Sequence, residues 1–127
     1  MSSSALQVCK RSIIVTHKVA GFHKWPTPLA SVAHLGDRHR HLFGFRVEFD
    51  VAHDERDVEF QLAQAAVRNA ISLFPVGDLG FEFGGRSCET IAVEVGQALA
   101  SAFAAPSAVE VWEDDEFGAR VEFAGPP

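Results

Sequence analysis

The chain has 127 residues, of which 47% are hydrophobic and 22% are charged, as expected of one globular domain with its own core. Its net charge of -6, without a basic cluster, argues against nucleic acid as a partner. No apolar run is long enough to cross a membrane and the N-terminus lacks the apolar segment of a signal peptide, so a cytoplasmic location is expected. Residues 1–11 are predicted to be a loose tail, and residues 12–124 to form the single domain.

The first predicted strand covers residues 12–23. Apolar and polar side chains alternate along it, and His17 and His23 share the apolar parity. Residues 24–38 contain two prolines and a glycine and are predicted to form a long connection. Connections of this length often carry functional residues.

A second strand is predicted over residues 39–52, where the sequence HLFGFRVEFDV begins at His41. Its phenylalanines and valines occupy odd positions, whereas glycine and charged residues occupy even ones. This period of two is typical of a strand with one buried face. His39 and His41 have the parity of the apolar set, so both are expected to point to the inner face.

Two helices are predicted to follow. The first begins near Asp54, a plausible N-cap, and shows apolar residues at helical spacing until Pro75 stops it. The glycine-rich segment 75–86 is predicted to be a loop. Ser87 is expected to cap the second helix, which carries an amphipathic stripe and ends before Pro106.

The last two predicted strands contain residues 109–113 and 121–123, joined by a turn over 114–118. The expected element order is therefore β-β-α-α-β-β, an α+β fold in which two helices cover one face of a four-stranded antiparallel sheet. Because the other face and the sheet edges need cover as well, the protein is expected to form oligomers.

Three of the six histidines form a pattern that predicts a metal site. His39 and His41 lie on one face of a strand, and His23 ends the neighbouring strand with the same parity. Strands in a hairpin are about 4.8 Å apart, so the three rings can converge. Three imidazoles without a fourth protein ligand are typical of a catalytic zinc site, which keeps one position open. A cupin is disfavoured, since that pattern requires a glutamate soon after the histidine pair and a later histidine.

Two glutamates are candidates for a pocket beside this site. Glu113 has the inward parity of its strand, and a carboxylate in that position can bind the guanidine-like edge of a heterocycle through two hydrogen bonds. A buried salt bridge or a solvated strand end explains Glu113 equally well. Glu89 lies in the first turn of the second helix beside Ser87, where compensation of the helix dipole is the simplest explanation.

The sequence resembles the 6-pyruvoyltetrahydropterin synthase and 6-carboxytetrahydropterin synthase family over residues 12–124. The motifs that carry the resemblance are GFHKWP at 21–26, HRHLFGFRVEF at 39–49, VEF at 58–60, RSCETIA at 86–92 and VEVWED at 109–114. The spacing of the histidines and the order of the motifs are moderately specific. The helix motifs alone are weak.

The resemblance implies a T-fold (tunnelling fold) subunit in a homo-oligomer, a trimer or a hexamer of two stacked trimers, with the pocket between subunits. It implies that His23, His39 and His41 bind Zn²⁺, that Glu113 holds a pterin ring, and that Glu89 and Ser87 lie near the pocket. The implied activity is that of a zinc-dependent lyase acting on a pterin or on the dihydroneopterin triphosphate-like precursor of pterins and deazapurines.

The sequence departs from this family in its proton-transfer groups. The family has a cysteine just before the histidine pair, where this chain has Leu35, and an Asp-His dyad after the first helix, which is absent here. Residues near these motifs that could replace the missing groups are Asp37, Cys88, His34 and the pair His53 and Asp54.

Three hypotheses follow from these departures. The first is an active lyase-like enzyme with non-standard proton-transfer residues. The second is a catalytically inactive pterin- or purine-binding or regulatory homologue that keeps the zinc and the pocket. The third is an oligomeric scaffold in which zinc only braces the strands. A carboxylate or thiol within reach of the open metal position would favour the enzyme, and apolar side chains such as Leu35 alone would favour the binding protein.

Overall fold

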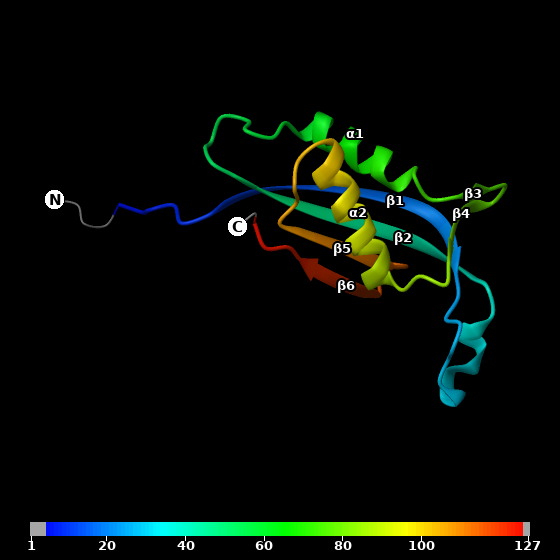
Figure 1. Cartoon of the computed structure of the whole chain (residues 1–127). Coiled ribbons are helices and arrows are strands. Elements are labelled where there is room, and N and C mark those ends of the chain that lie inside the picture. Colours follow the sequence, from blue (N-terminus) through cyan, green and yellow to red (C-terminus); the bar gives the residue numbers. More distant parts are fainter. Residues whose placement is uncertain (1–4, 126–127) are drawn as a thin grey trace.

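Two long strands, β1 (Arg11–His23) and β2 (His39–Val51), form the centre of a six-stranded mixed sheet with the order β3-β4-β1-β2-β5-β6. The computed structural model describes residues 5–125. The other elements are η1 (Ala30–Gly36), α1 (Phe60–Ile71), β3 (Val76–Gly77), β4 (Gly80–Gly84), α2 (Cys88–Ala102), β5 (Ala108–Glu113) and β6 (Phe117–Glu122). Helices α1 and α2 pack on one face of the sheet, and the loop with η1 projects from its end (Figure 1).

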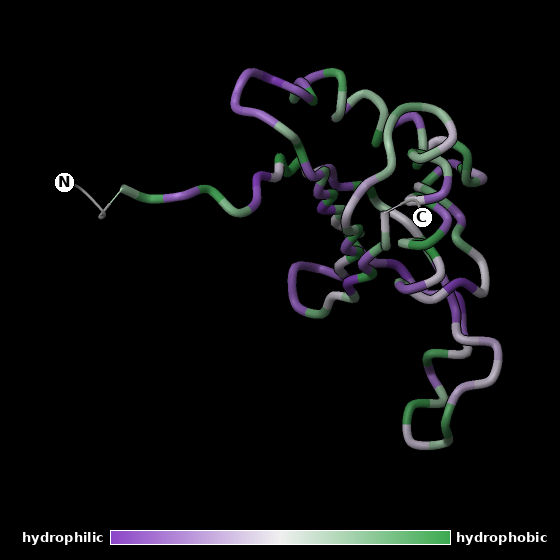
Figure 2. The backbone as a smooth tube through the Cα atoms, turned by 60° about the vertical axis from the view of Figure 1, so that its left-hand side comes forward, coloured by the Kyte–Doolittle hydropathy of each residue, from purple (hydrophilic) through white to green (hydrophobic). Residues whose placement is uncertain are grey.

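The alternation predicted for the central strands is present. Odd-numbered side chains of β2 face the helices and are almost fully buried, namely Phe43, Phe45, Val47 and Phe49. Figure 2 shows the same alternation as changes between green and purple along the strands. The core that they form with α1 and α2 is continuous and ends at His23 and His41, whose rings meet the edge of Phe43.

The fold-class prediction of a four-stranded antiparallel sheet with two helices is wrong. The segment 75–86, predicted to be a loop, forms the β3–β4 hairpin, and β4 pairs in parallel with the end of β1. The glycines that favoured a loop permit this hairpin, since Gly80 and Gly84 have positive φ angles. Phe83 between them is fully buried against Phe43. A third helix, the 3-10 helix η1, lies in the predicted connection 24–38.

Both long helices start at capping side chains. The Ser87 hydroxyl accepts a hydrogen bond from the Thr90 amide at the start of α2, as predicted. The predicted N-cap of the first helix at Asp54 is wrong, because Glu59 caps α1 instead and Asp54 pairs with Arg11. The Asp54 carboxylate has Arg11 as its partner and therefore does not need the free amides at a helix N-terminus.

Residues 5–10 are exposed, have no regular secondary structure and extend away from the sheet (Figure 1). Residues 1–4 of the predicted tail lie outside the described residues, and β1 already begins at Arg11. Within residues 5–125, no helix combines the length and the apolar character needed to cross a membrane.

The sheet face opposite the helices carries a network of charged side chains. Arg46 Nη1 lies 2.6 Å from Glu48 Oε2 and 2.9 Å from Glu110 Oε2, and Arg120 Nη1 lies 2.7 Å from the same Glu110 oxygen. The register explains the network, because Glu110 pairs directly with Arg46 on one side and with Arg120 on the other. Opposite charges on directly paired residues stabilise a sheet.

This network makes stability depend on pH. Hydrogen bonds from Arg120 lower the pKa of Glu48, and the pKa of Glu110 is also lowered, because bonds from Trp112 and the arginines outweigh its burial. A carboxyl with a lowered folded-state pKa adds stability above its unfolded pKa, about 4.3 for glutamate, and loses it as the pH falls through the folded value.

We therefore expect the urea midpoint of unfolding to fall when the pH is lowered from 5 to about 3. The variant Arg120→Met is expected to show a smaller fall, since its glutamates have pKa values closer to those of the unfolded chain. Arg68→Met, which changes an exposed arginine of α1, is the control and should behave like the parent. Equal pH dependence in Arg120→Met and the parent protein would contradict this assignment.

Candidate metal centre and adjoining pocket

Three histidines converge where β1 ends and β2 begins. His23 and His39 are direct cross-strand partners, and His41 lies two residues further along β2 on the same face. The ring centroids are 4.6 Å apart for His23 and His39, 5.2 Å for His23 and His41, and 4.9 Å for His39 and His41. One ring nitrogen from each lies within 4.8 Å of the other two, so the cluster could hold a metal ion.

The Nδ1 atom of each ring is held by a separate acceptor. Nδ1 of His23 lies 3.0 Å from the carbonyl oxygen of Arg86, and Nδ1 of His39 lies 2.8 Å from that of Asp37. Nδ1 of His41 lies 2.7 Å from Oδ2 of Asp114. A carbonyl oxygen only accepts, so Nδ1 of His23 and His39 must donate, and the lone pair of each neutral ring is then on Nε2. Metal-binding histidines are typically oriented by such partners.

The Nε2 atom of His41 provides a direct test of whether a metal fits. It is buried, and no hydrogen-bond partner for it exists among residues 5–125. A buried polar nitrogen without a partner costs about 1–3 kcal/mol. A cation at the centre of the cluster would accept its lone pair and remove this cost, so the residues present fit a metal ion.

Glu113, at the end of β5, faces the same histidines. Its Cα pairs with that of Phe43, which places the carboxylate one pleat from His41. Oε2 lies 3.1 Å from Nε2 of His23, and Oε1 lies 3.5 Å from Nε2 of His41. When His23 is protonated, the hydrogen bond from its Nε2 lowers the pKa of Glu113 more than burial raises it, so the carboxylate is ionised at neutral pH. Burial lowers the pKa of His23, but bonds to Glu113 and Arg86 outweigh it and raise the value.

Cys88, the first residue of α2, lies on the other side of Glu113. Its Sγ is 3.3 Å from Oε2 of that carboxylate. Burial, and then the negative charge of Glu113, raise the pKa of the thiol well above its ordinary value. At neutral pH Cys88 is therefore a thiol that donates a hydrogen bond to Glu113, not a thiolate.

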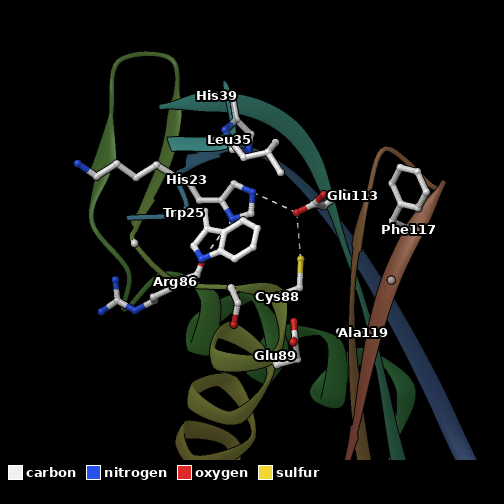
Figure 3. A pocket seen from close by; sticks show the side chains of 14 residues that line it. His23, Trp25, Leu35, His39, Arg86, Cys88, Glu89, Glu113, Phe117 and Ala119 are labelled. Atoms are coloured by element: carbon white, nitrogen blue, oxygen red, sulfur yellow. Dashed lines mark hydrogen bonds and ion pairs between the residues drawn. The ribbon is translucent and has the colours of Figure 1, made fainter. Parts of the chain in front are cut away.

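These groups line a pocket of about 340 Å³ between the end of β1, the start of α2 and the β5–β6 turn (Figure 3). In Figure 3, Trp25 lies on the His23 side, Glu113 on the opposite side and Cys88 near the base. Carboxylates, a thiol and apolar side chains all reach the pocket, and its lining comprises His23, Lys24, Trp25, Leu35, His39, Gly85, Arg86, Ser87, Cys88, Glu89, Glu113, Phe117, Gly118 and Ala119.

The structure brings together only some of the residues proposed from the sequence. One pocket is lined by His23 and His39 together with Ser87, Cys88, Glu89 and Glu113. Asp37 contributes a backbone carbonyl that orients His39, and its own carboxylate is not part of the pocket lining.

The pair His53 and Asp54 is far from this pocket. His39 and Val51 are the two ends of the 13-residue strand β2, which places them roughly 40 Å apart at about 3.3 Å per residue. Both residues line a second hollow beside Arg11 at the opposite end of β1. His34 is exposed in η1 and is not among the residues that line the pocket of Glu113.

Sequence reasoning missed three contributors to the site. Asp114 orients His41 and also accepts a hydrogen bond from the Leu42 amide, at 2.8 Å, from a left-handed conformation with φ of 54°. The sequence did contain a signal for Asp114. It is an aspartate directly after the inward Glu113, at the first position of the turn, and aspartate tolerates the left-handed conformation. The Arg86 carbonyl and the Trp25 side chain had no comparable signal.

Comparisons with known proteins leave the family open. No protein-family model matches the sequence, and no curated protein matches it significantly. The function is therefore inferred from the residues and geometry of this site.

Proposed function

We propose that the protein is a zinc-dependent lyase-like enzyme of the 6-pyruvoyl- or 6-carboxytetrahydropterin synthase type. Its substrate in this proposal is a pterin or a dihydroneopterin triphosphate-like compound. The observation that carries the proposal is the convergence of three oriented imidazoles beside an ionised carboxylate, in a pocket that can admit a small molecule. The motif order of the sequence supports the same family.

The donor set supports zinc as the metal. Three imidazoles with Nδ1 bound to outer acceptors are the ligands of many catalytic zinc sites, which leave one coordination position open. Zinc in such a position polarises a bound oxygen and makes neighbouring protons more acidic. The chain's own contribution is to hold the imidazoles in the required tautomer and to pack the rings of His23 and His41 against Phe43.

Glu113 is the proposed anchor of the heterocycle. An ionised carboxylate can accept two parallel hydrogen bonds from the N–H groups at the edge of a pterin, and a Zn²⁺ ion beside Glu113 would favour this ionised form as a protonated His23 does. Cys88 supports this role by donating to Oε2, which fixes the orientation of the carboxylate. Glu89 and Ser87 line the same pocket and are proposed to contact the substrate.

The second candidate function is a binding or regulatory protein that holds a pterin or purine without converting it. Two observations support it. Leu35 lines the pocket where the family would place its cysteine, and the thiol that does reach the pocket has a raised pKa and is a poor base. Turnover is the property that separates the two functions.

A homo-oligomer, a trimer or a hexamer, is part of the proposal. Strand β6 is at one edge of the sheet, and Phe117 at its start is 70% exposed beside the pocket, so a second copy could complete both. Light scattering at micromolar concentration should give a multiple of 13.8 kDa. A monomeric mass would contradict this part of the proposal.

The enzyme proposal is tested with zinc-loaded protein and dihydroneopterin triphosphate, with products separated by chromatography. Turnover by the parent protein and its loss in His39→Ala are expected. His17→Ala, which removes a half-buried histidine from the middle of β1, is the control and should retain turnover. Tight pterin binding without turnover would establish the second function instead. A parent protein that retains no zinc and behaves like His39→Ala would overturn both.

A further inference from the structure

The two tryptophans of the chain have very different surroundings. Trp112 lies on the open sheet face, where its Nε1 donates to Glu110 at 2.8 Å and its ring covers Gly118. Trp25 lines the same pocket as His23 and His39 and is 39% exposed. Trp25 does not belong to the hydrophobic core formed within residues 5–125, so core packing does not account for its position.

The backbone around Trp25 is nevertheless firmly held. The Trp25 amide donates to the Leu35 carbonyl at 2.7 Å, and the preceding amide, of Lys24, donates to the Gly84 carbonyl at 2.9 Å. On its other side, Pro26 packs so closely against Gly85 that a Cβ there would lie 2.8 Å from the proline ring. The exposure of the indole therefore reflects a fixed position at the pocket wall and not a loose loop.

The indole of Trp25 lies across the pocket from Glu113, the carboxylate proposed to bind the edge of a heterocyclic ring. Figure 3 shows Trp25 on the His23 side and Glu113 across the pocket, with Cys88 near the base between them. A flat bicyclic ring whose edge meets Glu113 can lay one face on the indole. Aromatic stacking of a heterocyclic base on such a side chain strengthens binding by roughly 5- to 150-fold.

We propose that Trp25 is the stacking platform of the pocket and a specificity-determining residue that selects planar heteroaromatic rings. This inference rests on the proposed function, because it assigns how the same pocket holds a pterin-like ligand. A reduced tetrahydropterin offers Glu113 the same pyrimidine edge, but its second ring is puckered and stacks poorly. Stacking on Trp25 therefore distinguishes a planar pterin from a tetrahydropterin, which Glu113 alone would bind equally well.

The test uses the zinc-loaded full chain and two probes, biopterin and tetrahydrobiopterin, with affinities measured by calorimetry under anaerobic conditions. The parent protein is expected to bind biopterin about tenfold more tightly than tetrahydrobiopterin. Trp25→Leu should lose this preference and bind biopterin about tenfold more weakly, and Trp25→Phe should restore part of it. Trp112→Phe is the matched control and should bind both probes like the parent.

Fluorescence gives a second readout that does not depend on the stability of Trp25→Leu. In Trp112→Phe the only tryptophan is Trp25, and saturating biopterin should quench its emission far more than that of Trp112 in Trp25→Phe. Unchanged biopterin affinity in Trp25→Leu, or equal quenching in the two single-tryptophan proteins, would overturn the platform while leaving the proposed function in place. Absence of biopterin binding by the zinc-loaded parent would overturn the proposed function, and the platform with it.

Discussion

Zinc affinity is expected to fall by more than about a hundredfold in His39→Ala. Loss of an outer partner of a metal-binding histidine alone costs roughly 10- to 100-fold in affinity, and loss of the ligand itself should cost more. The remaining pair, His23 and His41, would present only two imidazoles, too few for a tight site. Competition with a chromophoric chelator measures the affinity directly.

His53→Ala is the matched control for this measurement. His53 is also a histidine with an acidic neighbour, since its Nε2 lies 3.6 Å from Oδ1 of Asp57, but it lies at the far end of β2. The control should keep the zinc affinity of the parent. Asp114→Ala should fall between the two, because it removes the partner of Nδ1 in His41 and the acceptor of the Leu42 amide but no metal ligand. Parent-like zinc affinity in His39→Ala would show that the metal is bound elsewhere.

Binding of biopterin to the zinc-loaded protein is expected to weaken by roughly 150-fold in Glu113→Gln. The substitution keeps the size of the side chain but replaces an ionised acceptor pair with a neutral amide that offers one acceptor and unwanted donors. Hydrogen bonds to a charged group are worth up to about 3 kcal/mol, which corresponds to that factor in Kd. Calorimetry with the zinc-loaded variant measures the change.

Zinc content must be followed in the same samples. Glu113 is not among the residues whose ligand atoms cluster within 4.8 Å, so Glu113→Gln should retain the metal. Glu122→Gln, which changes an exposed glutamate of β6, is the control and should bind biopterin like the parent. Parent-like biopterin binding in Glu113→Gln would show that the Glu113 carboxylate does not bind the ligand. The proposed family would then lose its main structural support.

The metal cluster could be predicted because it depends on one simple periodicity. In a strand every second side chain shares a face, so the parity of His39 and His41 with the phenylalanines of β2 placed both rings inward. Residues that pair across two strands are close together, so His23 joins the cluster if β1 ends opposite the start of β2. The pairing of His23 with His39 shows that it does. The inward orientation of Glu113 followed from the same rule applied to β5.

The outer part of the site could not be predicted, because it depends on tertiary positions that no local pattern encodes. The hydrogen bond between Cys88 and Glu113 joins the start of a helix to the end of a strand that lies 25 residues later. The carbonyl of Arg86 reaches His23 only because the β4 strand pairs with β1 and carries the following loop to that place.

The fold class was missed for a related reason. Glycines in the segment 75–86 indicated a loop, and glycine does weaken strands. Here Phe83 is fully buried against Phe43, and this packing outweighs the local preference. To predict that β4 pairs in parallel with β1, one must know where the chain returns after α1. The periodicity within residues 75–86 does not contain this information.

In the proposed function, His23, His39 and His41 together bind one zinc ion and leave a position open beside Glu113. X-ray absorption at the zinc edge of the zinc-loaded protein tests it most directly. We expect three imidazole nitrogens at about 2.0–2.1 Å, a further light atom and no sulfur. A sulfur neighbour at about 2.3 Å, or fewer than three imidazoles, would contradict it.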